Sequence, residues 1–181
     1  MSYYANIDKY TLHSALGGAS AYNCLEQNRY ELNSLCKWLR TNQVKTWLEI
    51  GISHGYLQRF MRDEMQMLTV GITPDRLQTH DGLSVIYGYS QDKNVIATAK
   101  AYGMFDMIFV DGDHSYEAVK SDYLNYRSMG RFMAFHDACG LRSCEGVNKL
   151  LSEIRQQHPE MVFFIDNTDF RSGIAVIDLS P

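Results

Sequence analysis

The sequence predicts an α/β domain: a three-layer, Rossmann-like fold with a mostly parallel seven-stranded sheet and a C-terminal antiparallel hairpin. One observation is that five apolar runs of strand length alternate with segments of helical periodicity between residues 46 and 154. Such alternation is typical of a parallel sheet covered by helices on both faces. The other is that the last two runs, 162–165 and 174–177, lie too close together for a parallel crossover, which predicts a hairpin.

Each expected element has its own local signal. Leu32, Leu35 and Leu39 recur at helical spacing within 26–40 and predict an amphipathic helix. Thr73-Pro74 predicts a helix start, because threonine is a good N-cap and proline suits the first helical position. The five expected strands span 46–50, 67–72, 83–87, 107–110 and 131–135. Residues 1–181 are expected to form one domain, with an arm or lid over 1–24, an N-terminal helix region over 25–45 and the Rossmann-like core over 46–178.

The composition excludes several classes of partner. The net charge of −4 is mild, and no basic stretch predicts binding to nucleic acid or to a membrane surface. No apolar run approaches the roughly 20 residues of a membrane span, and the start has no signal-peptide pattern. The four cysteines form no CxxC pair, which favours reduced thiols. We therefore expect a cytoplasmic protein that acts on a small molecule. The sequence does not decide between a monomer and a homodimer.

Ionisable residues follow two of the expected strands directly. Asp111, Asp113 and His114 come after the strand 107–110, and His136 with Asp137 comes after 131–135. If these strands are parallel neighbours, about 4.8 Å apart, the carboxylates of Asp111 and Asp137 meet at one edge of the sheet. Carboxylates that close repel unless they are protonated or bridged by a cation, and their oxygens suit magnesium first, with calcium and manganese as the alternatives. The competing interpretation is a polar turn that caps a helix.

A glycine turn follows the first strand. Glu49, Gly51, Ser53 and Gly55 alternate along it, and a helical pattern begins at once. The spacing does not match the dinucleotide fingerprint, because Ser53 takes the place of the second glycine. The carboxylate and bare backbone instead suit a ligand that carries an amino acid. We expect a side chain at Gly51 to exclude that ligand without harming the fold.

Three segments together resemble one family. Residues 49–55 resemble motif I (E-x-G-x-G-x-G) of the class I S-adenosylmethionine-dependent methyltransferases. Residues 88–92, with the sequence GYSQD, are similar to the G-x-S-Q-D segment of the catechol-type O-methyltransferases. Residues 105–116, together with His136-Asp137, resemble the acidic segments of the metal-dependent sugar and catechol O-methyltransferases.

The resemblance implies a role for each matching position. Glu49, Gly51, Ser53 and Gly55 would surround the methionine end of S-adenosyl-L-methionine, and Asp111 would also contact that cofactor. Ser90 and Gln91 would lie at the adenine. The metal ligands would be Asp111, His136 and Asp137. His114 stands where the family has a lysine base, and an imidazole can remove a hydroxyl proton near neutral pH.

Two departures from the family pattern matter. The acid that holds the ribose hydroxyls is missing: Gly71 or Thr73 takes its place, and Asp75 is the nearest substitute. His136 replaces an aspartate, which lowers the negative charge of the site and favours manganese. We expect an enzyme that transfers a methyl group to a small hydroxylated substrate with help from a divalent metal. A catalytically inactive binding module and a metal-dependent hydrolase are the alternatives.

Overall fold

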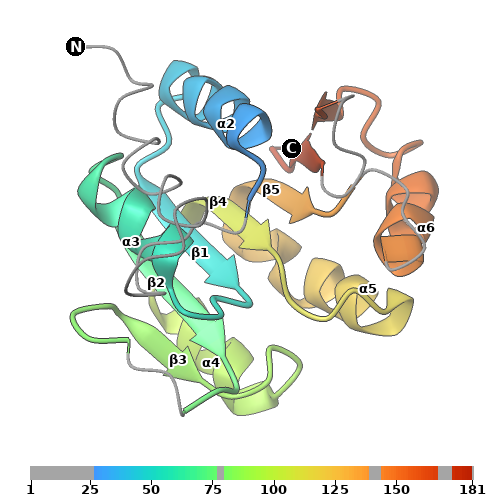
Figure 1. Ribbon diagram of the computed structural model, residues 1–181. Helices are drawn as coiled ribbons and strands as arrows, with labels where there is room; N and C mark the ends of the chain where they lie inside the picture. Colours follow the sequence, from blue (N-terminus) through green and yellow to red (C-terminus); the bar gives the residue numbers. More distant parts are fainter. Residues whose placement is uncertain (1–26, 77–79, 139–143, 167–172, 181) are drawn as a thin grey trace, which may run out of the picture.

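The computed structural model describes residues 27–76, 80–138, 144–166 and 173–180 (Figure 1). Seven strands form one sheet in the order β3-β2-β1-β4-β5-β7-β6. The strands are β1 (Thr46–Ile50), β2 (Leu68–Thr73), β3 (Val85–Tyr87), β4 (Phe105–Val110), β5 (Gly130–His136), β6 (Val162–Phe164) and β7 (Ile174–Asp178). The helices are α2 (Arg29–Thr41), α3 (Tyr56–Asp63), α4 (Lys93–Ala101), α5 (Tyr116–Tyr126) and α6 (Glu145–Ile154), with a 3-10 turn η2 (Arg127–Met129).

The sheet has the predicted topology. Strands β1 to β5 pair in parallel, whereas β7 runs antiparallel to both β5 and β6. The predicted C-terminal hairpin is therefore confirmed. The predicted arm or lid over 1–24 lies outside the described residues.

Both faces of the sheet are buried, which explains why its central strands carry mainly apolar residues on both faces. In β1, Leu48 packs into a core cluster with α4, α5 and α6, while Trp47 points to the opposite cluster with α2 and α3. In β4, Ile108 and Phe109 divide between the two clusters in the same way. Trp47 and Phe109 stack at a ring distance of 5.0 Å. A strand with helices on both sides has no polar face, as expected for a parallel sheet.

Helix α2 holds the N-terminal part of the described chain against the hairpin. The side chain of Asn28 caps the helix by accepting hydrogen bonds from the backbone N–H groups of Tyr30 and Glu31. The buried carboxylate of Glu31 in turn accepts from the N–H groups of Asp166 and Gly173, both at 2.8 Å. These two residues flank the connection between β6 and β7, so α2 is fixed to the hairpin.

The predicted helix after Thr73 is wrong for the residues that the structure describes there. Thr73 Oγ1 does accept a hydrogen bond from the N–H of Asp75, but residues 74–76 and His80 are not helical. His80 is buried, and its Nε2 donates to the carbonyl of Ser53 at 2.8 Å. This contact draws the connection back over the glycine turn.

None of the described helices combines the length and the apolar character needed to cross a bilayer.

Candidate active site

The carboxyl ends of β4 and β5 bring ionisable side chains together. The two strands pair in register, with Val110 opposite Phe135, so the residues that follow each strand lie at the same edge. His136 Nδ1 lies 3.1 Å from Asp111 Oδ1 and 3.5 Å from Asp137 Oδ1. One ligand atom from each of these three residues falls within 4.8 Å of the others. We call Asp111, His136 and Asp137 the carboxylate–imidazole cluster.

The backbone at Asp137 has a conformation that residues other than glycine rarely adopt. Its φ is +57°, in the left-handed region, immediately after the last residue of β5. This geometry costs free energy, and it persists at functional sites when the surroundings enforce it. The bend lets the carboxylate of Asp137 face the side chains that follow β4.

His114 completes this arrangement from the start of α5. Its Nε2 lies 3.0 Å from Asp137 Oδ2 and 3.7 Å from Asp111 Oδ1. These nitrogens face carboxylates, yet His114 Nε2 and both ring nitrogens of His136 are buried without a properly oriented hydrogen-bond partner among the described residues. Buried polar atoms nearly always have partners, so these orphaned atoms indicate a missing ligand.

The charges in the cluster depend on one another. Burial alone would raise the pKa of Asp111, but His114 and His136 outweigh it and lower that pKa. In Asp137, the same two histidines overcome the effect of burial and lower the pKa of the carboxyl. Conversely, Asp111 and Asp137 raise the pKa of His114. Without a cation, positive imidazolium groups therefore balance the carboxylates.

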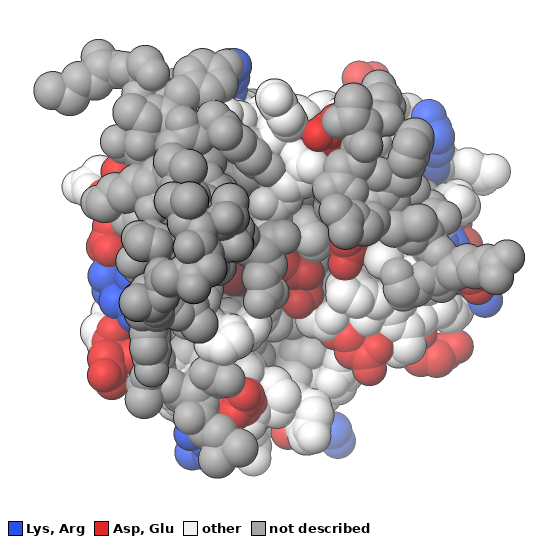
Figure 2. All heavy atoms as spheres, viewed as in Figure 1, with Lys and Arg blue, Asp and Glu red and all other residues white. Residues whose placement is uncertain are grey.

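The cluster suits a divalent cation. Two carboxylates and one imidazole form a donor set of mixed oxygen and nitrogen, which Mg²⁺ and the first-row transition metals accept. A bound cation would use the orphaned nitrogen of His136, and it would replace the protons that balance the carboxylates. In the space-filling view, some Asp and Glu atoms are visible near the centre of the face and others lie at its edges, whereas the visible Lys and Arg atoms lie toward its periphery (Figure 2).

The glycine turn lies beside this cluster, between β1 and α3. Gly51 has φ of +92°, and a Cβ there would overlap the carbonyl oxygen of Asp111 and the Cα of Gly112. The expectation that a side chain at Gly51 leaves the fold intact is therefore wrong, because the glycine accommodates the protein's own backbone. Gly55 has φ of +73°, and Ser53, in the place of the family's middle glycine, has φ of +43°.

A small pocket of about 20 Å³ opens over this turn. Its lining includes Glu49, Gly51, Ser53 and Asp111, together with Gln27 from the residues that precede α2. Glu49 is buried and accepts a hydrogen bond from Trp47 Nε1 at 3.1 Å. Burial, and secondarily the charge of Asp111, raises the pKa of Glu49 to about 8. The pocket therefore unites the two carboxyl groups that the motif analysis assigned to the methionine end of the cofactor.

The predicted adenine residues lie after β3, and a buried acid joins them. Gln91 Nε2 donates to Asp122 Oδ1 at 3.2 Å, and the side chain of Ser90 also bonds to Asp122. The carbonyl of Ser90 accepts a hydrogen bond from the Tyr126 hydroxyl at 2.8 Å. Burial raises the pKa of Asp122 to about 6.

The structure shows which of Gly71 and Thr73 lies at the end of β2, where the family's ribose-binding acid is expected. Gly71 lies inside β2, paired with Glu49 and Val85, so it is not at the edge of the sheet. Thr73 is the last residue of β2, and its buried hydroxyl bonds to the N–H of Asp75. Thr73 therefore stands at the carboxyl end of β2, and no carboxylate replaces it within that strand.

Two residues of the site, Gln27 and Asp122, lie outside the motifs and were not predicted. Asp122 shares the inward face of α5 with Val119 and Tyr126, so a polar residue on an apolar face was the available signal. Gln27 lies outside the segments of the resemblance, and no local pattern marks it. Its Nε2 donates to Asp111 Oδ2 at 3.0 Å.

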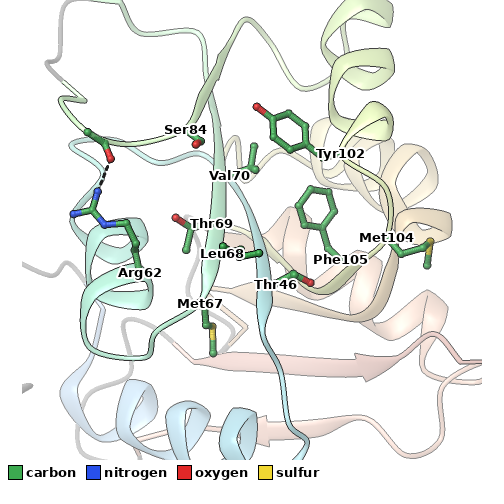
Figure 3. Close-up of a pocket in the computed structure, with 11 residues that line it drawn as sticks. Thr46, Arg62, Met67, Leu68, Thr69, Val70, Ser84, Tyr102, Met104 and Phe105 are labelled. Carbon is green, nitrogen blue, oxygen red and sulfur yellow. Dashed lines mark hydrogen bonds between the residues drawn. The ribbon is translucent and has the colours of Figure 1, made fainter.

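A second pocket, of about 350 Å³, opens at the opposite edge of the sheet, where β1, β2 and β4 begin (Figure 3). Its rim includes the exposed apolar side chains of Leu68, Tyr102 and Met104. Arg62 reaches across to donate a hydrogen bond to the carbonyl of Gly82. No carboxylate or imidazole is among the described residues that line it, so it lacks acid–base chemistry.

Several solved structures share the fold over most of the chain. Cofactor-bound Rv0187 from MTB matches with a TM-score of 0.67 and 14% identity, over 98% of this chain and 96% of that one. A putative caffeoyl-CoA O-methyltransferase from Staphylococcus aureus matches with a TM-score of 0.65 and 15% identity, over 98% and 93% of the two chains.

A third similar structure is that of a complex with Mg. MycE from the mycinamycin biosynthetic pathway, in complex with Mg, SAH and mycinamycin VI, matches with a TM-score of 0.61 and 18% identity. This match covers 87% of the present chain and 52% of MycE. No protein-family model and no curated protein sequence matches the chain. The protein has the fold of the class I S-adenosylmethionine-dependent methyltransferases, as the resemblance of its motifs predicts.

Proposed function

We propose that this protein transfers a methyl group from S-adenosyl-L-methionine to a hydroxyl of a small substrate, with a divalent cation at the carboxylate–imidazole cluster. The observation that carries the proposal is the convergence of Asp111, His136 and Asp137 beside the glycine turn, with buried histidine nitrogens that lack partners among the described residues. A structural polar turn would pair these atoms with one another. Solved structures that share the fold include an O-methyltransferase in complex with SAH and a methyltransferase in complex with Mg and SAH.

His114, Asp111 and Asp137 would each have a separate role in methyl transfer. When bound, the cofactor supplies the methyl group, and the cation lowers the pKa of the substrate hydroxyl. His114 Nε2 faces the cluster and accepts the hydroxyl proton. Asp137 and Asp111 then stabilise the imidazolium that results, since both carboxylates lie within 4 Å of that nitrogen. The hydroxyl oxygen loses its proton to His114 and forms a bond to the methyl carbon, while the bond from that carbon to the sulfonium sulfur would break and S-adenosylhomocysteine would leave.

Calorimetric titration with S-adenosylhomocysteine, in the presence and absence of Mg²⁺ or Mn²⁺, tests the proposal. We expect the nucleoside to bind and the cation to bind independently at one site. Binding of the cation without any binding of the nucleoside would instead favour a metal-dependent hydrolase. Binding of the nucleoside with no cation site would leave a metal-independent methyltransferase or a binding module.

A further inference from the structure

Gln27 is buried beside the candidate cofactor pocket, although it belongs to none of the motifs. It directly precedes Asn28, which caps α2, and only 8% of its surface is exposed. Its side chain reaches Asp111, 84 positions away in the sequence, and lines the pocket over the glycine turn. A glutamine at this depth loses most of its contact with water, so both ends of its amide need partners.

One end of that amide has a partner and the other has none. Nε2 donates to Asp111 Oδ2 at 3.0 Å, whereas Oε1 is buried without a donor among the described residues. The orientation of the amide is fixed, because an ionised carboxylate only accepts hydrogen bonds and therefore requires the NH₂ group. Oε1 can therefore accept a hydrogen bond from a ligand in the pocket.

We propose that Gln27 binds the amino group at the amino-acid end of S-adenosylmethionine, an inference that rests on the proposed function. The pocket offers three acceptors, from Gln27, Glu49 and Asp111, and no lysine or arginine is among its described lining residues. An ammonium group has three N–H donors and a positive charge, so it matches both the number and the polarity of these groups. The first turn of α3 also lines the pocket, and the dipole at a helix N-terminus favours the carboxylate of the same ligand.

A role confined to structure would have a different consequence. If Gln27 only stabilised the packing of the segment before α2 over the glycine turn, its loss would weaken every cofactor-like ligand equally. If Gln27 binds the ammonium group, its loss weakens only ligands that carry the amino acid. S-adenosylhomocysteine has this part, and 5′-methylthioadenosine lacks it, so this pair of ligands separates the two roles.

The test compares Gln27→Met with the wild-type protein by calorimetric titration of both ligands. Methionine keeps the length and much of the shape of glutamine but removes the amide. We expect S-adenosylhomocysteine to bind about tenfold more weakly, the usual effect of losing a hydrogen bond to a charged group. The affinity for 5′-methylthioadenosine should change by less than about twofold. Asn28→Ala serves as the matched control, because it perturbs the same end of α2 but does not line the pocket.

Each outcome has a defined meaning. Unchanged affinity for S-adenosylhomocysteine, or an equal loss for both ligands, overturns the assignment of Gln27 while the proposed function stands. Wild-type protein that binds both ligands equally well also overturns it, and this measurement does not depend on the variant folding. Wild-type protein that binds neither ligand refutes the proposed function itself, and the inference with it.

Discussion

The carboxyl ends of the strands form a rim whose two halves differ in the hydrogen bonding of their buried polar groups. In the half formed by β4 and β5, His114 and His136 leave buried nitrogens without partners among the described residues. In the half formed by β2 and β3, the polar groups at the strand ends have partners, although Gln58 Oε1, beside Gly71 of β2, has none among the described residues. Thr73 bonds to the backbone of Asp75, and Ser90 bonds to Asp122.

The difference indicates what each half needs from a ligand. Orphaned nitrogens next to two carboxylates suit a cation, so the β4–β5 half has the groups to accept one. In the β2–β3 half, Thr73, Ser90 and Gln91 already have partners, and a ligand there must share or replace existing hydrogen bonds. We therefore expect substitutions in the β4–β5 half to affect binding and turnover most strongly, and substitutions in the other half to affect mainly stability.

The largest effect is expected for Asp137→Ala. Two ligands from the protein are too few to hold a hard divalent cation against water, so cation binding and metal-dependent activity should both be lost. S-adenosylhomocysteine should still bind, because its pocket is lined from β1 and Asp111 and does not include Asp137. Calorimetry with Mg²⁺ and with S-adenosylhomocysteine measures the two effects separately.

Asp113→Ala is the matched control for that variant. Asp113 also follows β4, but it is exposed and accepts a hydrogen bond from the N–H of Ser115 at the start of α5. Its loss should cost about 1 kcal/mol of stability and leave the cation affinity unchanged. Equal cation affinity in Asp137→Ala and wild type would remove the carboxylate–imidazole cluster as the metal site.

His114→Ala should retain both ligands but slow methyl transfer. His114 Nε2 faces the cluster without belonging to its ligand set, so cation affinity should be close to that of the wild type. The loss of a general base typically slows turnover by about 10²- to 10⁴-fold. Single-turnover rates at saturating cofactor report this loss directly. If the variant loses the cation as well, His114 is a metal ligand and another group is the base.

Gly51→Ala should destabilise the fold by about 3 kcal/mol. The positive φ and the overlap with the Asp111 backbone each contribute, and neither depends on a ligand. Gly112→Ala is the control, because a Cβ there has its nearest contact at an ordinary 3.7 Å. Urea unfolding in the absence of ligands compares the two variants. Equal stabilities would show that the β1 turn can move away from β4.

The sequence predicted this molecule best where local chemistry determines the structure. The strand 46–50 has its predicted bounds because an apolar run buried on both faces has clear ends. The meeting of Asp111 and Asp137 follows from the adjacency of β4 and β5, which the alternation of strands and helices implies. The roles of these residues in metal binding and catalysis stay predictions.

Contacts between distant segments account for what could not be predicted. The failed helix after Thr73 has a valid local capping signal, but the contact of His80 with Ser53 overrides it. Gln27 meets Asp111 only because α2 packs across β1 and β4. The reason for a glycine at position 51 is likewise the crossing of two backbone segments, which no single motif contains.

The pH dependence of Asp122→Asn tests whether Ser90 and Gln91 satisfy the buried acid in the β2–β3 half. The folded protein holds the proton of Asp122 up to about pH 6, whereas the unfolded chain releases it near the ordinary value of 3.8. Between these values the folded state binds more protons, so this carboxyl makes stability fall as pH rises from about 4 to about 6. Asparagine has no such proton, yet it can still accept from Gln91 and donate to Ser90. The difference in unfolding free energy, variant minus wild type, should therefore rise across this range by up to about 3 kcal/mol and stay level above it. Urea unfolding at a series of pH values measures that difference, and taking the difference cancels the contributions of the other titrating groups. A flat difference would mean that Asp122 keeps an ordinary pKa, and that water or a ligand, rather than Ser90 and Gln91, completes its hydrogen bonds.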